Sequence, residues 1–425
     1  MNDLELHAHL IGRQGSRAAL NTPALVLDLD ALDRNIAAMA ALVAAHGVKL
    51  RPHAKTHKSI DIARRQIGAG AIGLCCAKIG EAEVLADGGI GRLLITSPVA
   101  APAAIERLAA LARRSPGLMA VVDHPNVAQA IDRALAAADT LLDVSASDTM
   151  LDVSASDTML DVSASDTVLD VSASDTMLDV FAADTVLDVI IDIDPGIRRT
   201  GVASAEHAVA LARAIEAAPR LRYRGVQFYC GVQQHIASFA ERRAAIEERT
   251  RYLQDVIAAL TVEGFTPDIV TGSGTGTHRI DLDLGVFTEL QAGSYVFMDA
   301  QYLDCDLADG PQSPFETALG VDARVVSANH AALVTIDAGF KSLSTDGGVA
   351  AVRNGAPPGT RFVFMGDEHG ALIGPGIGDD LKPGDPVTLT VPHCDPTVNL
   401  YDTYHVVRAD TLIDLWPVSA RGRAR

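Results

Sequence analysis

A lysine lies between two histidines in the segment RPHAKTHKS, which runs from Arg51 to Ser59. The apolar stretch before it, ending in HGVKL, has the pattern of a β-strand, so Lys55 should lie near the mouth of the fold. A lysine amine has a pKa of about 10.4 and becomes a nucleophile for aldehydes once that pKa is lowered. We expect burial and nearby positive charge from Arg51, His53 and His57 to lower it. The alternative is an ion pair between Lys55 and an acid at the rim.

A second candidate is the loop GSGTGT, made of small residues whose backbone N–H groups and hydroxyls can converge on a phosphate. Its phosphate-binding candidates are Ser273, Gly274, Thr275, Gly276 and Thr277. Such a loop alone is a weak signal, but after the last strand of a barrel it coincides with the usual phosphate site. A phosphate loop and a lysine at one mouth suggest pyridoxal 5′-phosphate, joined to Lys55 as a Schiff base.

Further polar residues follow other predicted strands. Arg199 lies in IDIDPGIRRTGV, and Tyr229 and His235 lie in FYCGVQQH. In the C-terminal segment PHCDPTVN, residues i and i+2 of an extended strand face the same side, so His393 and Asp395 should point together. From these residues alone, a surface hydrogen bond between the two is the favoured interpretation, because two ligands do not define a metal site.

These residues need elements to position them. Apolar, β-branched stretches begin near Ala24, Val48, Ile72, Arg92, Leu118, Leu187, Tyr223 and Asp268. Helical patterns such as ALDRNIAAMAALVAAHG separate them. Eight strands alternating with helices predict an α/β fold that closes as a (β/α)8 barrel over residues 23–290. A doubly wound open sheet is the competitor, but no glycine-rich turn follows the first strand.

After residue 290 the sequence pattern changes to short stretches that alternate apolar and polar residues and are broken by glycine and proline, as in RFVFMG and DPVTLTVPHCD. This pattern predicts a C-terminal antiparallel β domain over residues 291–425, which includes His393 and Asp395. The N-terminal segment, residues 1–22, is a candidate addition to it.

A nine-residue unit, LDVSASDTM with small variations, repeats five times over residues 142–186. A calcium-binding β-solenoid also uses nonapeptides, but the five units contain no glycine for its turns. We therefore interpret the repeat as a tandem duplication inserted before the strand near Leu187. Because that is the amino-terminal end of a barrel strand, we expect activity to survive the insertion.

Composition limits the partners. The formal net charge is −19, which argues against nucleic acid or an anionic membrane as a partner. We see neither a transmembrane stretch nor a secretory signal. The five cysteines are scattered, as expected for free thiols in a reducing cytoplasm.

Taken together, TPALVLDLDALDRNI, RPHAKTHKS, IDIDPGIRRTGV, TGSGTGT, ELQAGSYVFMD and VPHCDPTVNLYD resemble the D-threonine aldolase and D-serine dehydratase family. The resemblance covers nearly the whole chain apart from the repeat. It implies the alanine-racemase-like architecture of fold-type III pyridoxal-phosphate enzymes, with Lys55 bound to the cofactor. His278, directly after the phosphate loop, departs from the aromatic residue of the family pattern.

The resemblance also implies residue roles. Arg199 corresponds to the arginine directed at the cofactor's phenolic oxygen, and Tyr229 to a tyrosine close to the cofactor. His235 corresponds to the proposed general base of the aldolases. His393 and Asp395 match the family's divalent-metal pair, where the dehydratases have a His-x-Cys pattern that suits zinc. An imidazole with a hard carboxylate instead suits Mn²⁺ or Mg²⁺ better than Zn²⁺.

The activity implied is aldol cleavage of a small-molecule β-hydroxy-D-amino acid to glycine and an aldehyde, by a metal-activated lyase. A D-serine or 3-hydroxy-D-aspartate dehydratase is the first alternative. A non-catalytic pyridoxal-phosphate carrier is the second, although carriers resemble the barrel alone. The family also implies a homodimer in which the β domain of one subunit closes the barrel mouth of the other.

Overall fold

Two sheets build the molecule. The computed structural model describes residues 2–146, 185–310 and 312–425. The first sheet has eight parallel strands in the order β2-β9-β8-β7-β6-β5-β4-β3. Their bounds are β2 Lys49–Leu50, β3 Cys75–Cys76, β4 Leu94–Ile95, β5 Met119–Val122, β6 Leu187–Asp192, β7 Leu221–Phe228, β8 Ile269–Gly272 and β9 Glu289–Leu290.

The parallel sheet closes between its first and last strands. The amide of Ile72 donates to the carbonyl of Leu50 at 2.9 Å, and the amide of Cys75 donates to the carbonyl of Pro52 at 2.9 Å. His53 and Cys75 also form a parallel bridge. These bonds join β2 to β3, which confirms the predicted (β/α)8 barrel and excludes the open sheet.

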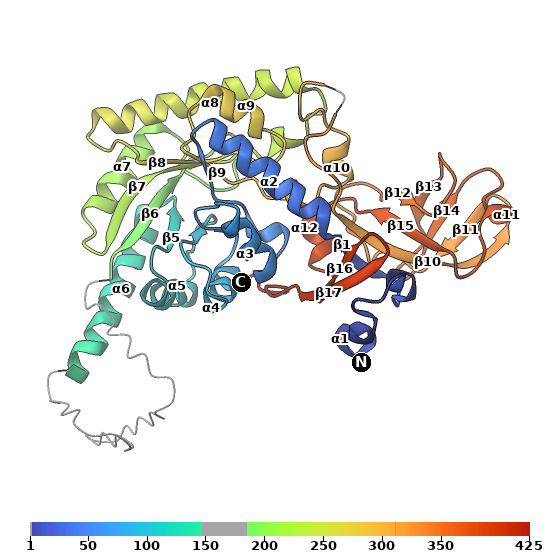
Figure 1. The fold of residues 1–425 in the computed structure, drawn as a ribbon. Helices are drawn as coiled ribbons and strands as arrows, with labels where there is room; N and C mark the ends of the chain where they lie inside the picture. Colours follow the sequence, from blue (N-terminus) through green and yellow to red (C-terminus); the bar gives the residue numbers. More distant parts are fainter. Residues whose placement is uncertain (1, 147–184, 311) are drawn as a thin grey trace, which may run out of the picture.

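Helices cover the outside of the barrel (Figure 1). They are α2 Leu29–Ala45, α3 Ile60–Gly68, α4 Ile79–Asp87, α5 Pro102–Arg114, α6 Pro125–Ala146, α7 Ala205–Glu216, α8 Phe239–Val262 and α9 His278–Leu284. Several of these helices begin after an N-cap residue whose side chain accepts hydrogen bonds from backbone N–H groups of the first turn, as Asp28 does for α2 and Ser238 for α8. The repeat predicted over residues 142–186 overlaps the end of α6 and otherwise lies outside the described residues, apart from its last two.

The strand near Ala24 is not the first strand of the barrel, and that prediction is wrong. Strand β1, Ala24–Asp28, pairs with β10 and β16 of the second sheet. Leu25 and Leu27 are buried in the main core, while Val26 is buried on the opposite face in a smaller cluster. A strand covered on both faces has a continuous apolar run, so its sequence resembles that of a barrel strand. The missing barrel strand is β9, which has two residues and no readable period.

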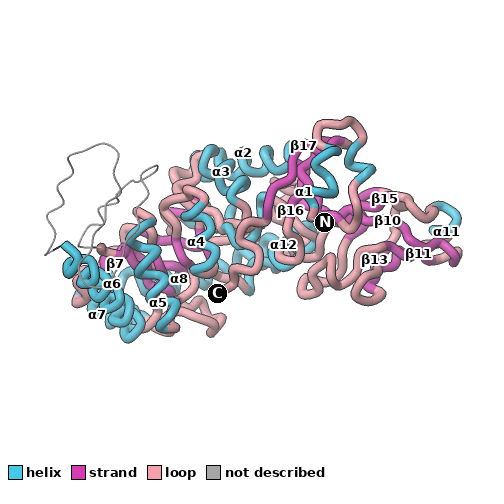
Figure 2. The backbone as a smooth tube through the Cα atoms, turned by 90° about the horizontal axis from the view of Figure 1, so that it is seen from below, coloured by secondary structure: helices cyan, strands magenta, loops and turns pink. Residues whose placement is uncertain are grey.

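The second sheet confirms the predicted antiparallel β domain. Its nine strands are β1 with β10 Leu319–His330, β11 Leu333–Ile336, β12 Ala351–Asn354, β13 Arg361–Phe364, β14 Gly370–Ile373, β15 Pro386–Thr390, β16 Thr403–Arg408 and β17 Thr411–Pro417. Every pairing except β1 with β16 is antiparallel. Figure 2 shows the barrel toward one end of the molecule and β10, β11, β13 and β15 of this sheet toward the other, with β16 and β17 between them.

Short helices complete the chain. They are α1 Asp3–His7, α10 Ala300–Leu303, α11 Ile377–Asp380 and α12 Cys394–Val398, with 3₁₀ turns η1 Ala8–Leu10, η2 Ser16–Ala19, η3 Ala54–Thr56, η4 Val232–His235 and η5 Ser294–Val296. The N-terminal segment lies against the β domain, where the amide of Gly12 donates to the carbonyl of Leu412 at 2.8 Å. Among the described residues, no helix is both long and apolar enough to cross a membrane. All five cysteines are free.

Candidate active site

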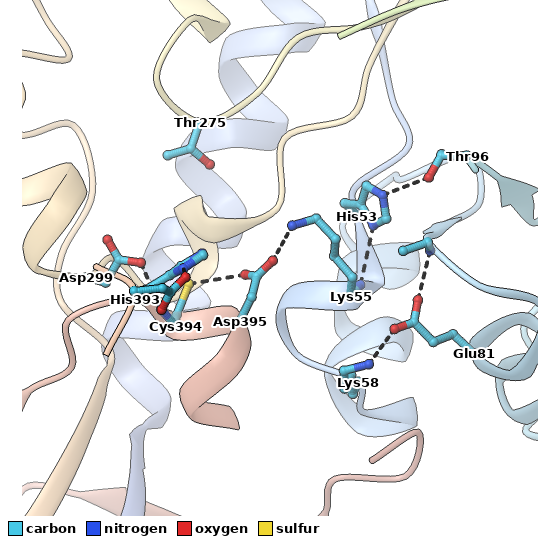
Figure 3. Close-up of polar contacts among 12 residues, drawn as sticks. His53, Lys55, Lys58, Glu81, Thr96, Thr275, Asp299, His393, Cys394 and Asp395 are labelled. Carbon is cyan, nitrogen blue, oxygen red and sulfur yellow. Dashed lines mark hydrogen bonds and ion pairs between the residues drawn. The ribbon is translucent and has the colours of Figure 1, made fainter. Parts of the chain in front are cut away.

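Lys55 lies in the 3₁₀ turn η3, directly after the first barrel strand. Its backbone amide is held by Nδ1 of His53 at 3.4 Å, and its side chain is 39% exposed. The Nζ atom forms an ion pair with the carboxylate of Asp395, which comes from the β domain (Figure 3). The alternative given above for Lys55 is therefore present in the structure, with the acid supplied by the other domain.

This ion pair overturns the expectation that the surroundings lower the pKa of Lys55. Burial does act to lower that pKa, but the negative charge of Asp395 and the neighbouring Tyr229 act against it, and the net shift is upward. The amine is therefore held protonated for as long as Asp395 faces it.

The positive charges expected around Lys55 are also missing. Arg51 is buried and paired with Glu289, its Nε 2.9 Å from one carboxylate oxygen and its Nη2 3.1 Å from the other. Burial lowers the pKa of His53 to about 3 and that of His57 to about 4. Both rings are therefore neutral at neutral pH, and neither adds positive charge beside Lys55.

The loop of small residues follows β8, which is the seventh barrel strand because β1 belongs to the other sheet. Ser273 has a φ of 69°, a strained value for a residue with a Cβ, and its buried Oγ has no hydrogen-bond partner within the described part of the chain. A Cβ at Gly274 or Gly276 would collide with Gln234. The amide of Gly276 donates to Oε1 of Gln234 at 2.9 Å. The clash at Gly274 is with the end of the Gln234 side chain, whereas that at Gly276 is with its backbone, so glycine is required at Gly276. An unpaired hydroxyl and this close approach fit a loop that wraps a phosphate.

Hydrogen bonds to residues outside the loop hold Thr275 and Thr277 in place. Oγ1 of Thr275 accepts the amide of Tyr295 at 3.0 Å, and the Thr277 hydroxyl donates to Asp281 at 2.6 Å. His278 is fully buried, with Nδ1 2.8 Å from the carbonyl oxygen of Thr275. Burial lowers the pKa of His278 to about 4, so this departure from the family pattern acts as a neutral aromatic ring.

Arg199 and Tyr229 lie together at the ends of β6 and β7. The guanidinium carbon of Arg199 is 6.0 Å from the ring centre of Tyr229, and both line a small cavity with Asp192 and Gln227. Nε2 of Gln227 donates to Asp192 at 2.9 Å. Burial raises the pKa of Tyr229 and raises that of Asp192 to about 6. The cavity therefore offers a cation and polar groups, in line with a site for a cofactor's ring oxygen.

His235 ends the turn η4, and its ring centre is 4.6 Å from that of Tyr302. Burial lowers the pKa of His235, and the charges of His393 and Arg242 lower it further. The imidazole is therefore neutral at neutral pH, as a general base must be.

The metal pair is not in an extended strand, so that part of the prediction is wrong. His393 precedes α12 and Asp395 lies in its first turn. Cys394 is fully buried, and its amide donates to Oδ2 of Asp299 at 2.9 Å. Burial acts to raise the pKa of Asp395, but the opposing interactions, led by the positive charge of Lys55, outweigh it, so the net shift is downward and this carboxylate stays ionised. One imidazole and one ionised carboxylate fit a divalent ion that completes its shell with water.

Within the described ranges, a single group of three potential metal ligands occurs, Asp3, His7 and His405, and it is elsewhere in the β domain. The backbone amide of Asn21 donates to Nε2 of His7 at 3.0 Å, which puts the ring proton on Nδ1. That proton points at Nε2 of His405, 2.9 Å away, whose Nδ1 faces the carbonyl of Leu25 at 3.2 Å. A satisfied hydrogen-bond chain therefore explains this cluster without a metal.

Sequence reasoning missed four residues that shape the site: Gln234, Asp299, Tyr302 and Asp346. Gln234 directly precedes His235, and Asp299 ends the segment ELQAGSYVFMD. Nothing in residue type or spacing marks the other two, because their partners come from distant parts of the chain.

Comparisons with known proteins identify the family of this chain. Residues 27–147 and 150–301 match the family "Alanine racemase, N-terminal domain", and residues 318–407 match "Putative serine dehydratase domain". The chain is 35% identical to the 3-hydroxy-D-aspartate aldolase of Paracoccus denitrificans, over 95% of this chain and 93% of that protein. It is 34% identical to the D-threonine aldolase of Arthrobacter sp, over 96% and 94%. The chain belongs to the D-threonine aldolase and D-serine dehydratase family.

A solved structure supports the assignment to this family. The crystal structure of D-threonine aldolase from Filomicrobium marinum superposes with a TM-score of 0.81 at 34% identity, covering 96% of this chain and 97% of that one. The family has the alanine-racemase-like fold of pyridoxal-phosphate enzymes, which confirms the resemblance stated from the motifs.

Proposed function

We propose that this protein is a metal-activated, pyridoxal-phosphate-dependent aldolase that cleaves β-hydroxy-D-amino acids of the D-threonine type to glycine and an aldehyde. The observation that carries the proposal is the ion pair between Lys55 and Asp395. It joins the lysine of the barrel to the candidate metal pair of the β domain, so one substrate can reach both. The identity of 34–35% to two aldolases supports the same reaction.

Lys55 would hold the cofactor covalently, with Arg199 at its phenolic oxygen and Tyr229 beside its ring. The phosphate would lie in the loop of Ser273, Gly274, Thr275, Gly276 and Thr277. When bound, pyridoxal 5′-phosphate supplies an electron sink for the negative charge left at Cα when the Cα–Cβ bond breaks. The unpaired hydroxyl of Ser273 and the close approach of Gln234 to the two glycines support this placement.

His393 and Asp395 would hold the divalent ion, Mn²⁺ or Mg²⁺ in preference to Zn²⁺. Such an ion supplies Lewis acidity that lowers the pKa of the substrate's β-hydroxyl. His235 then takes the hydroxyl proton on a ring nitrogen, directly or through water. Its lowered pKa supports this role, because the ring is free to accept a proton at neutral pH.

The dehydratase alternative needs different chemistry at the same place. The dehydratases of the resemblance have a cysteine two residues after the metal-binding histidine, whereas this chain has Asp395 there. Cys394 is fully buried, and burial raises the pKa of its thiol well above the ordinary value. A thiolate ligand is therefore disfavoured, and aldol cleavage is the better-supported reaction.

One assay tests the proposal. The purified protein is incubated with pyridoxal 5′-phosphate, Mn²⁺ and either D-threonine or 3-hydroxy-D-aspartate, and products are identified by mass. We expect glycine and an aldehyde; a keto acid with ammonia would show a dehydratase, and no product would support a carrier. His235→Gln should abolish cleavage with the cofactor's absorbance intact. Lys55→Ala should lose the covalent cofactor; a covalent adduct retained in Lys55→Ala would overturn the assignment.

We further propose a cytoplasmic homodimer. Exposed apolar side chains on the β domain support a subunit contact, with Phe340 44%, Val363 40% and Met365 52% exposed. Five free thiols and the strongly negative net charge agree with the cytoplasm and with small-molecule substrates. Light scattering coupled to size-exclusion chromatography would give the molecular mass of the protein in solution. A monomer mass at micromolar concentration would contradict the dimer.

A further inference from the structure

We propose that Asp346 is a positioning residue for the metal-binding histidine. It holds the imidazole of His393 in the tautomer that carries its proton on Nδ1, so that Nε2 is the nitrogen presented to a divalent ion. This inference rests on the proposed function, because it assigns a task to the loop behind the proposed metal pair.

The contact between the two side chains determines the tautomer. Nδ1 of His393 is 2.7 Å from Oδ2 of Asp346. An ionised carboxylate can only accept a hydrogen bond, so Nδ1 of His393 must donate. A neutral imidazole carries one ring proton, which leaves a lone pair on Nε2. The tautomer of a metal-binding histidine is set in this way by the partner of its other nitrogen.

The loop between β11 and β12 is built around His393. The hydroxyl of Ser344 donates to the carbonyl of His393 at 3.1 Å and accepts its amide at 3.1 Å. The hydroxyl of Thr397 donates to the same carbonyl at 2.8 Å and accepts the amide of Ser344 at 3.1 Å. A Cβ at Gly347 would lie 2.8 Å from Cβ of His393. These hydroxyl bonds hold the loop against His393 and so keep Asp346 beside the ring.

The loop also explains why the sequence did not reveal this residue. Asp346 is 47 positions from His393 and its side chain is 54% exposed. It therefore reads as an ordinary surface aspartate. Only the folded β domain brings it to Nδ1 of His393.

The effect is measured as affinity for Mn²⁺. We titrate the full chain, loaded with pyridoxal 5′-phosphate, and follow free Mn²⁺ by electron paramagnetic resonance. Asp346→Ala should weaken binding about 10- to 100-fold, as for other partners of metal-binding histidines. The control is Asp367→Ala, which removes the same charge from an exposed position of the same domain and should leave the affinity unchanged.

A second measurement needs neither metal nor turnover. Nitrogen-15 resonances of His393, identified by their loss in His393→Ala, report which ring nitrogen carries the proton in the metal-free holoenzyme. We expect the Nδ1–H tautomer in the wild type and its loss in Asp346→Ala. An Nε2–H tautomer in the wild type would overturn the inference.

The two proposals can fail separately. If His393→Ala loses Mn²⁺ and Asp346→Ala binds it as tightly as the wild type, the metal site stands and the positioning role is wrong. If His393→Ala binds Mn²⁺ as tightly as the wild type, the proposed metal site is wrong and the inference falls with it.

Discussion

At the scale of single residues, the glycines of the phosphate loop are defined by what lies beside them. A Cβ at Gly276 would collide with the backbone carbonyl of Gln234, the residue before His235. Gly276→Ala should push the loop and the η4 turn apart. We expect the affinity for pyridoxal 5′-phosphate to fall at least about 10-fold, since small misplacements of binding groups are costly. Absorbance titration with the cofactor measures it.

The matched control is Gly68→Ala at the end of α3, where a Cβ meets nothing within 4 Å. Replacing a helical glycine there should leave cofactor binding unchanged and stabilise the fold by up to about 1 kcal/mol. Cofactor affinity equal to that of the wild type in Gly276→Ala would show that this loop does not hold the phosphate.

At the scale of elements, one buried arginine of α8 holds the segment that follows His235, the proposed general base. Arg242 is fully buried, and its guanidinium donates to the carbonyls of Ile236, Ala237 and Asp306. It therefore ties the residues after η4 to the segment after α10. Arg242→Met removes the arginine donor from the carbonyls of Ile236 and Asp306, at a cost of about 1–3 kcal/mol for each one that stays buried and unpaired. The carbonyl of Ala237 still accepts the amide of Asp306 at 2.9 Å. We expect lower thermal stability, together with a lower kcat because His235 is displaced.

Arg243→Met is the comparison for this change, because it alters the neighbouring residue of the same helix. Arg243 forms ion pairs with Glu247 and Asp283 near the surface, so its loss should cost less than about 1 kcal/mol and leave kcat unchanged. Equal effects of both substitutions on kcat and melting temperature would contradict the role given to Arg242.

At the scale of the whole molecule, buried neutral histidines make stability depend on pH. Burial lowers the pKa of His53 to about 3 and those of His57 and His278 to about 4, from 6.5. Below pH 6.5 the unfolded chain binds protons that the folded chain does not, so stability is full above 6.5 and falls with pH. Asp192 and Asp281, whose pKa values burial raises to about 6, act in the opposite direction and offset part of this loss.

We therefore expect the free energy of unfolding, measured in urea, to fall from pH 7 to pH 5. The pH dependence should correspond to a net uptake of about one proton on unfolding. His278→Phe keeps a ring against Phe315 and removes one titrating group, so it should flatten the slope. A wild-type stability that stays constant, or rises, over this interval would show that these rings are not buried as neutral groups.

The insertion of residues 142–186 also belongs to this scale. It connects α6 to Leu187, the first residue of β6, while the site lies beyond the other end of that strand. Deleting these 45 residues should therefore leave kcat within about twofold of the wild type. A large rise in turnover after deletion would show that the repeat restrains the site.

The sequence by itself determined the features that depend on local pattern and residue type. The alternation of strands and helices, the lysine after a strand and the loop of small residues all have a short-range signal. They predicted the barrel, the β domain and the candidate residues Lys55, His235 and Arg199. The motifs around them also sufficed to predict the family.

Only the tertiary structure decided which groups meet. β1 carries the same apolar run as a barrel strand, yet it pairs with β10 and β16 of the second sheet. Asp395 lies 340 positions from Lys55 and raises the pKa that local charges were expected to lower. Asp346, in the loop between β11 and β12, contacts the ring of His393 although the two residues are 47 positions apart. Contacts between distant segments leave no period in the sequence, because packing of the whole chain brings them together.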